Sequence, residues 1–225
     1  MDSVNILYIH GMGGGGDSRI PGILRDNEAA FSPEGVRARV IVRTYSFDPE
    51  VAAGQIAAWM EELKPVLVVG ESLGSIHAIR LRGVPHLFVS PSLGAPTIFG
   101  RMAPLASIPG VTAFLDRFYR PRPGDRQPLH FSKDVLLKYT AHLEAALDNS
   151  PSRGGKDFFH AFFGRRDHYR KYGVVSIRKW RKYFGDNSFT MYDGTHFMEE
   201  GYVVSLLVPK IREILINLQF KDFQQ

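Results

Sequence analysis

The chain has 225 residues, of which 44% are hydrophobic and 23% are charged. These values exclude a disordered or fibrous chain, and the length predicts a single domain over residues 1–225 that carries an insertion. The absence of cysteine excludes a disulfide framework, a thiolate zinc site and a cysteine nucleophile. No apolar run approaches the roughly 18 residues of a membrane span, and no signal peptide is evident, so we expect a cytoplasmic protein.

The net charge of +5 is concentrated in one segment, residues 165–182, which we call the basic window. It holds eight basic residues and one acid, and the rest of the chain carries 20 basic residues against 22 acidic ones. Aromatic residues are interleaved with the charges: Tyr169, Tyr172, Trp180 and Tyr183. The window is interpreted first as a solvated helix face. A docking patch for an acidic substrate or partner and a stacking platform for nucleic acid are the alternatives.

Six β-rich segments predict the strands, which are Val4–Ile9, Val36–Arg43, Val66–Val69, His86–Ser90, Phe158–Phe163 and Ser188–Tyr192. Two of them contain continuous apolar runs, Ile6–Ile9 and Val66–Val69, which are typical of strands buried on both faces of a parallel sheet. Helical patterns lie between the strands: Pro49–Leu63, Leu73–Arg82, Ser132–Asp148, His168–Phe184 and Glu200–Leu218. Ser132 is a candidate N-cap. Strands that alternate with helices predict an α/β/α sandwich of three layers around a mostly parallel sheet.

The stretch from Pro91 to Phe131 interrupts this alternation, because it is rich in proline and glycine and lacks a clear period. A long irregular connection is often a lid or a binding loop. We therefore expect an insertion at about 91–131, with a short helix near Val111–Tyr119. An irregular connector without a role in binding is the alternative.

A Gly-x-Ser-x-Gly pattern, Gly70 to Gly74, follows one predicted strand directly and opens the next predicted helix. A serine on such a sharp turn projects its hydroxyl above the sheet, and the flanking glycines remove side chains that would clash there. The helix N-terminus behind it supplies N–H donors. The context predicts that Ser72 is a nucleophile.

A serine nucleophile needs a base, and the base needs an orienting acid. His196 lies just after the last predicted strand, and Asp167 follows the strand before it. Ligand sites of open parallel sheets lie at the carboxyl ends of strands, where all three residues fall. Asp186 and Asp193 are nearer to His196 in sequence, but Asp193 is expected to shape the turn that presents the histidine.

The first predicted strand leads into the segment His10–Gly16, which we call the glycine loop. Its backbone can approach a reacting carbonyl, and we assign the oxyanion donors to the N–H groups of Met12 and Leu73. His10, Gly11 and Gly13 are expected to support the loop. The same segment fits the dinucleotide fingerprint Gly-x-Gly-x-x-Gly. That site needs an acid about twenty residues on at the end of the second strand, but the strand predicted there ends Val42-Arg43-Thr44.

The order Ser72, Asp167, His196, with a glycine loop after the first strand, resembles the α/β-hydrolase superfamily. If the six predicted strands correspond to the third to eighth strands of that fold, each site residue falls in its matching place. The resemblance runs from Val4 to about Leu218 and lacks the family's first two strands. The short length and small insertion look like small bacterial esterases of the YqiA-like kind, which are minimally capped.

The resemblance implies a reduced α/β-hydrolase fold and two-step acyl transfer without a metal or organic cofactor. We expect a carboxylesterase that acts on a small or medium ester, with a small molecule rather than nucleic acid as partner. Thioesters, lysophospholipids and amides use the same machinery and stay open as substrates. A non-catalytic binding protein and a nucleic-acid binder are the alternatives from other classes. Arg165 and Arg166 precede Asp167 and are possible contacts to an anionic substrate.

Overall fold

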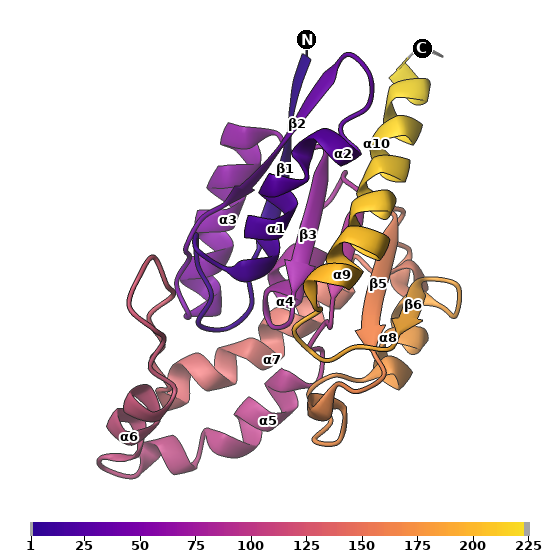
Figure 1. The fold of residues 1–225 in the computed structure, drawn as a ribbon. Helices are drawn as coiled ribbons and strands as arrows, with labels where there is room; N and C mark the ends of the chain where they lie inside the picture. The colour runs from indigo at the N-terminus through magenta and orange to yellow at the C-terminus, as the bar shows by residue number, and fades with distance from the viewer. Residues whose placement is uncertain (1, 223–225) are drawn as a thin grey trace.

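The computed structural model describes residues 2–222, whose strands form one sheet in which every neighbouring pair is parallel (Figure 1). The strands are β1 (Asp2–Ile9), β2 (Val36–Val42), β3 (Leu67–Glu71), β4 (His86–Val89), β5 (Phe159–Gly164) and β6 (Phe189–Tyr192). Their order across the sheet is β2-β1-β3-β4-β5-β6. The predicted strands are confirmed with ends shifted by two residues at most.

The helices between the strands are α1 (Arg19–Asp26), α2 (Glu28–Phe31), α3 (Pro49–Leu63), α4 (Gly74–Ile79), α5 (Ala95–Met102), α6 (Val111–Phe118), α7 (Lys133–Leu147), α8 (Ile177–Phe184), α9 (Glu200–Tyr202) and α10 (Val208–Asp222). Short 3-10 turns are η1 (Leu105–Ser107), η2 (Pro151–Arg153) and η3 (His168–Arg170). A π-helical turn, η4 (Val203–Leu207), joins α9 to α10.

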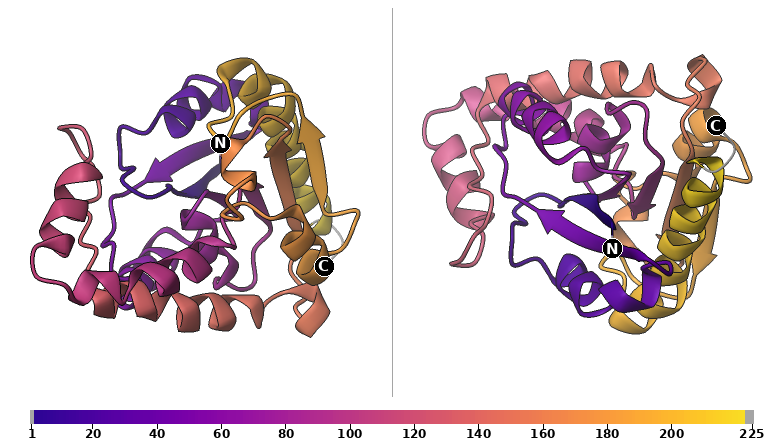
Figure 2. Two further views of the ribbon diagram at one scale, coloured as in Figure 1. Left: turned by 90° about the horizontal axis from the view of Figure 1, so that it is seen from below. Right: turned by 90° about the horizontal axis from the view of Figure 1, so that it is seen from above.

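The sheet separates two apolar cores. On one face α3, α4, α5, α7 and α8 pack around residues such as Ile76, Leu136 and Trp180. On the other face α1, α2 and α10 pack around residues such as Phe31 and Ile211. Both faces of the sheet are therefore covered by helices, which confirms the three-layer α/β/α architecture (Figure 2). None of the helices described is long and apolar enough to cross a bilayer.

Local signals explain where the long helices begin. The predicted bounds of α3 are confirmed, and the Asp48 side chain caps it by accepting a hydrogen bond from the Glu50 N–H at 2.9 Å. Ser132 is confirmed as the N-cap of α7, because its hydroxyl accepts from the Val135 N–H at 3.4 Å. An N-cap of this kind stabilises a helix by about 1 kcal/mol.

The prediction of a single helix over His168–Phe184 is wrong. The chain forms only η3 before it turns at Gly173, whose φ of 73° ends the helical conformation. The helix α8 then starts anew behind Ser176, whose hydroxyl accepts from the Lys179 N–H. The basic window is therefore not one helix face.

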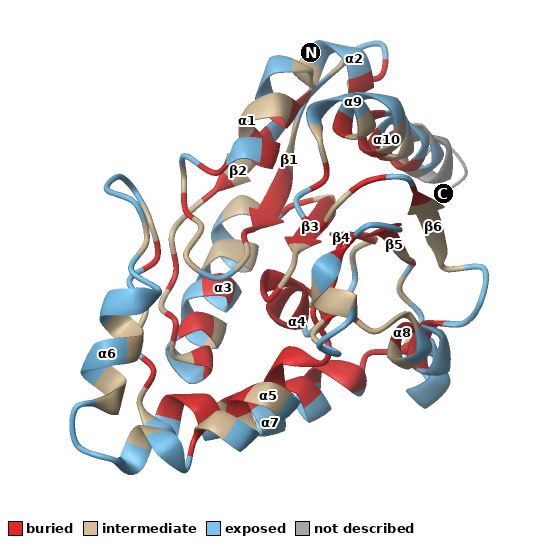
Figure 3. Ribbon diagram, turned by 60° about the horizontal axis from the view of Figure 1, so that its bottom comes forward, coloured by how far each residue is buried: buried red, intermediate tan, exposed pale blue. Residues whose placement is uncertain are grey.

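The stretch between β4 and α7 is more ordered than the sequence indicated. Its first part, α5, is packed in the core through Phe99, whereas residues 104–130 project beyond the carboxyl ends of the strands (Figures 1 and 3). We call residues 104–130 the flap. It contains the expected short helix, α6, which no buried residue anchors. Helices α1 and α5 were missed because each has only eight residues and carries an early proline.

Candidate active site

The turn from β3 to α4 holds Ser72 in a left-handed backbone conformation, with φ of 49°. This conformation costs a residue other than glycine on the order of 1–2 kcal/mol. The turn also needs Gly74, because a Cβ there would lie 2.2 Å from the carbonyl oxygen of His10. The strained serine and the close approach of β1 together place the hydroxyl above the carboxyl edge of the sheet.

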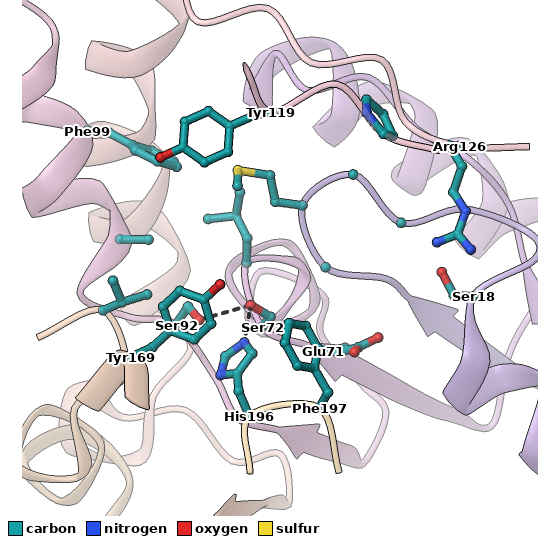
Figure 4. A pocket seen from close by; sticks show the side chains of 18 of the residues that line it. Ser18, Glu71, Ser72, Ser92, Phe99, Tyr119, Arg126, Tyr169, His196 and Phe197 are labelled. Carbon is teal, nitrogen blue, oxygen red and sulfur yellow. Dashed lines mark hydrogen bonds between the residues drawn. The ribbon is translucent and has the colours of Figure 1, made fainter. Parts of the chain in front are cut away.

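The three residues that the sequence predicted as nucleophile, base and acid lie in one hydrogen-bonded chain. Ser72 Oγ is 2.9 Å from His196 Nε2 (Figure 4). On the other side of the ring, His196 Nδ1 is 2.8 Å from Asp167 Oδ2. His196 and Asp167 are buried. With the carboxylate as acceptor, Nδ1 carries the imidazole proton and Nε2 accepts from the serine hydroxyl. Such a chain can move a proton from the hydroxyl to the imidazole.

Backbone contacts fix the carboxylate that faces the imidazole. Asp167 lies three residues beyond the end of β5, and its second oxygen, Oδ1, accepts from the Tyr169 N–H at 2.8 Å. The ring of Tyr169 then packs edge-on against His196, with 4.5 Å between centroids. The Asp167 carboxylate therefore hydrogen-bonds to His196 and forms no salt bridge with an arginine among the described residues.

The loop that presents His196 is shaped by Glu199, not by Asp193. The Glu199 carboxylate accepts from the Thr195 N–H at 3.1 Å, while Asp193 pairs with Arg166 at 3.2 Å on the surface. The expectation that Asp193 organises this turn is therefore wrong. Glu199 begins the next helix, so its carboxylate reaches back to the loop from a fixed position.

Most N–H groups of the glycine loop are occupied. Those of Gly13, Gly14, Gly15 and Gly16 donate to Gln127, Gly11, Ser18 and Asp125 respectively. Within the described part of the chain, the N–H groups of Met12 and Leu73 donate no hydrogen bond. A Cβ on Gly11 would lie 3.0 Å from the Cβ of Ser72, so the loop passes directly beside the serine. The N–H groups of Met12 and Leu73 are therefore free donors in the two segments that meet at Ser72, and the N–H of Gly11 likewise donates to no described residue.

His10 lies beneath this loop. Its Nδ1 is 2.8 Å from the Gly11 carbonyl oxygen, and its ring stacks on Tyr45 with 4.3 Å between centroids. The Tyr45 hydroxyl donates to the carbonyl oxygen of His10. Burial lowers the pKa of His10 to about 4, so the ring stays neutral and acts as a fixed donor to the loop.

Two polar residues beside the serine were missed. Ser92 Oγ is 3.1 Å from Ser72 Oγ and is buried in the loop after β4. Glu71 precedes Ser72, and it accepts from the Tyr8 hydroxyl at 2.7 Å. Burial raises the pKa of Glu71. The position of Ser92 just after a predicted strand was the signal that could have indicated it.

A cavity of about 770 Å³ opens above Ser72. Apolar side chains and arginines line it: Met12, Ile20, Ile98, Phe99, Met102, Tyr119, Phe131, Tyr169, Val174 and Phe197, with Arg19, Arg120, Arg122 and Arg126. Arg165 and Arg166 are exposed and are not among the residues that line this cavity. Its arginines come instead from the first helix and the flap.

No group of three or more histidine, aspartate or glutamate side chains is arranged to hold a metal ion in the described residues. No protein-family model matches the sequence, and no curated protein matches it either.

Solved structures do resemble the chain. Est1E from Butyrivibrio proteoclasticus, bound to ferulic acid, superposes with a TM-score of 0.62 at 14% identity over 96% of this chain and 89% of its own. A structure from work on the metagenome-derived lipolytic enzymes LipS and LipT gives 0.55 at 16% identity, covering 94% of both chains. An esterase domain from Rhodothermus marinus gives 0.52 at 15% identity over 93% of this chain and 87% of its own.

These similarities, together with the six-stranded parallel sheet covered on both faces, define an α/β-hydrolase fold. The resemblance found in the sequence is confirmed at the level of the fold. Kinship with the YqiA-like esterases stays a prediction.

Proposed function

We propose that the protein is a serine hydrolase and, more specifically, a carboxylesterase. The observation that carries the proposal is the hydrogen-bonded chain from Ser72 through His196 to the buried Asp167. Serine, imidazole and carboxylate in this order form the charge arrangement that activates a hydroxyl for attack on a carbonyl carbon. We also propose the cytoplasm as its compartment.

In the first half of the reaction, Ser72 Oγ bonds to the carbonyl carbon while its proton passes to His196 Nε2. The carbonyl oxygen becomes an oxyanion, and the free N–H groups of Met12 and Leu73 donate to it. A donor of this kind stabilises the transition state by about 2.7–4 kcal/mol. Asp167 stabilises the imidazolium and keeps the ring oriented. The carbon–oxygen bond of the ester then breaks, and the leaving alcohol takes the proton from Nε2.

In the second half, water replaces the alcohol. His196 accepts one proton from the water, and the resulting hydroxide bonds to the acyl carbon. The acyl–serine bond breaks, Ser72 takes the proton back, and the carboxylic acid leaves. No step needs a group outside the chain, the ester and water.

The substrate class follows from the cavity. Its apolar lining at Ile98, Phe99, Met102 and Phe131 supports a substrate with an aliphatic or aromatic acyl group. Its volume of about 770 Å³ suits a small or medium ester. A thioester or an amide would meet the same nucleophile and donors. Only a comparison of kcat/KM for the three kinds of substrate can show which leaving group is preferred.

Hydrolysis of p-nitrophenyl acetate and butyrate by the wild type and Ser72→Ala tests the proposal. Removal of a triad serine lowers kcat by about six orders of magnitude. We expect a fluorophosphonate probe to label the wild type and not the variant. A folded wild type that neither hydrolyses these esters nor reacts with the probe would contradict the proposal.

A further inference from the structure

Two arginines of the flap lie in a rigid extended segment at the cavity mouth. Arg120 and Arg122 alternate with Pro121 and Pro123, and proline fixes φ near −65° and biases the preceding residue to extended backbone. Both arginines line the cavity above Ser72 and also a neighbouring cavity of about 530 Å³. The two cavities share Pro121 and Arg126 as well, so they meet at a stretch of the flap that carries three arginines.

Arg120 and Arg122 are exposed and have no salt-bridge partner among the described residues, whereas Arg126, which lines the same cavity, has one. Arg126 pairs with Asp17 at 2.6 Å. Asp116 lines the second cavity, but its carboxylate already binds the His130 ring and the Phe131 N–H, each at 2.8 Å. The charge of Arg120 and Arg122 is left for a ligand.

The segment is held in place just after the two arginines. Asp125 accepts from the Thr44 hydroxyl at 2.5 Å and from the Gly16 N–H at 3.2 Å. The Gln127 N–H donates to the carbonyl oxygen of Gly14 at 2.6 Å, and the Gln127 side chain donates to the carbonyl oxygen of Ser46. The arginines are thus carried by a segment that is tied to the glycine loop.

The cavity above Ser72 has an apolar and a charged side. In Figure 4, Phe99 and Tyr119 lie to one side of Ser72, and Arg126 and Ser18 lie to the other. The segment between Tyr119 and Arg126 carries the two unpaired arginines, which also line the cavity. A ligand that fills both sides is apolar at one end and anionic at the other.

We infer that the site takes a single-chain amphiphilic ester whose leaving group carries a phosphate, bound by Arg120 and Arg122. The inference rests on the proposed function. The acyl chain occupies the apolar side, and the phosphate meets the guanidinium pair. A phosphate offers three terminal oxygens, enough to accept from both guanidinium groups, whereas a carboxylate offers two.

The first experiment measures binding to Ser72→Ala by calorimetry, so that no turnover is needed. The probes share an eight-carbon chain: octyl phosphate, octanoate and octyl glucoside, each below its micelle concentration. We expect octyl phosphate to bind about tenfold more tightly than octyl glucoside, with octanoate between them, as charge-assisted hydrogen bonds predict. Equal affinity for the three probes would overturn the inference.

Three double variants locate the anion site in the same background. R120Q/R122Q is expected to lose the preference for octyl phosphate, about a tenfold effect. R37Q/R39Q is the matched control, because it removes two exposed arginines at the same spacing from the edge strand β2. Retention of the preference in R120Q/R122Q, or its loss in R165Q/R166Q alone, would assign the anion to another surface and overturn the inference.

Kinetics then compare two esters that differ only in phosphate, 1-octanoylglycerol 3-phosphate and 1-octanoylglycerol. We expect kcat/KM of the wild type to be about tenfold higher for the phosphate ester, because its KM is lower. In R120Q/R122Q the two esters should have equal kcat/KM. If neither ester is hydrolysed while octyl phosphate still binds selectively, the proposed function fails and the anion site stands. A wild type that hydrolyses both esters equally overturns the anion site and leaves the hydrolase.

Discussion

The carboxyl edge of the sheet and the flap meet at one cavity but are built in opposite ways. At the sheet edge, Asp167 and His196 are 4% and 3% exposed, and their loops are held by hydrogen bonds from the Tyr169 N–H to Asp167 and from the Thr195 N–H to Glu199. On the flap, Phe114 and Phe118 are 64% and 69% exposed, and α6 has no buried residue (Figure 3). The proposed catalytic residues are therefore fixed by the core. The flap is instead held to the glycine loop by hydrogen bonds of Asp125 and Gln127, and its helix α6 buries no residue.

The largest effect on the sheet side should come from Asp167→Asn. The amide can donate to His196 Nδ1, which leaves the proton on Nε2, where it cannot accept from Ser72. We expect kcat for p-nitrophenyl butyrate to fall about 10⁴-fold with unchanged thermal stability. A loss below tenfold would show that Asp167 does not set the tautomer.

Trp180→Ala tests how strongly the face beneath the site is packed. Trp180 is fully buried, stacks on Phe184 with 4.0 Å between centroids, and donates from Nε1 to the Ser188 hydroxyl at 2.8 Å. Urea unfolding should report a loss of about 3–5 kcal/mol, the usual cost of truncating a buried aromatic residue. A loss under about 1 kcal/mol would contradict the close packing of α8 on the sheet.

Buried histidines make the sheet side sensitive to acid. Burial lowers the pKa of His86 to about 4, from an ordinary value near 6.5 in the unfolded chain. The unfolded state therefore binds the extra proton first, so stability is complete above about pH 6.5 and falls as the pH drops toward 4. This histidine alone contributes a loss of about 1.4 kcal/mol per pH unit, or roughly 3 kcal/mol over the window.

His86→Leu separates this contribution from the others. Burial also lowers the pKa of His10 to about 4 and that of His142 to about 3, so these two residues act in the same direction. The free energy of unfolding, measured in urea from pH 4.5 to 7, should depend less steeply on pH in the variant. An identical slope would show that His86 titrates normally in the folded protein.

The smallest effect is expected on the flap. Phe118→Ser removes a side chain that is 69% exposed, so the free energy of unfolding should change by no more than about 0.5 kcal/mol. It is the counterpart of Trp180→Ala on the other region. A loss of 2 kcal/mol or more would mean that α6 belongs to the core and would remove the contrast between the two regions.

The sequence predicted the sheet side well, because Ser72, Asp167 and His196 each lie within four residues of the end of a predicted strand. The catalytic roles themselves stay proposals. The position of Ser92 after a predicted strand placed it at the same edge of the sheet, but its contact with Ser72 depends on how β4 lies beside β3, which the sequence does not show. The break before α8 was signalled by Gly173, which the helical period of the flanking residues outweighed.

The structure of the flap could not be predicted from the sequence in the same way. Its prolines and glycines predicted an irregular segment, but the sequence does not indicate which side chains turn toward the cavity. The expectation that Arg165 and Arg166 lie at the cavity mouth followed from their nearness to Asp167 in the chain. Distance along the chain was a poor guide there, since Arg120 and Arg122 reach the cavity from the flap.

The contacts of Gln127 have a mechanical consequence. Its side chain accepts from the Gly13 N–H, and its own N–H donates to the carbonyl oxygen of Gly14. One residue of the flap therefore holds two neighbouring residues of the glycine loop. The amide protons of Gly13 and Gln127 should therefore exchange with solvent through one opening event. A ligand that displaces the flap would therefore also move the glycine loop, which carries the Met12 N–H. The same displacement would then change both access to the cavity and the position of this proposed oxyanion donor.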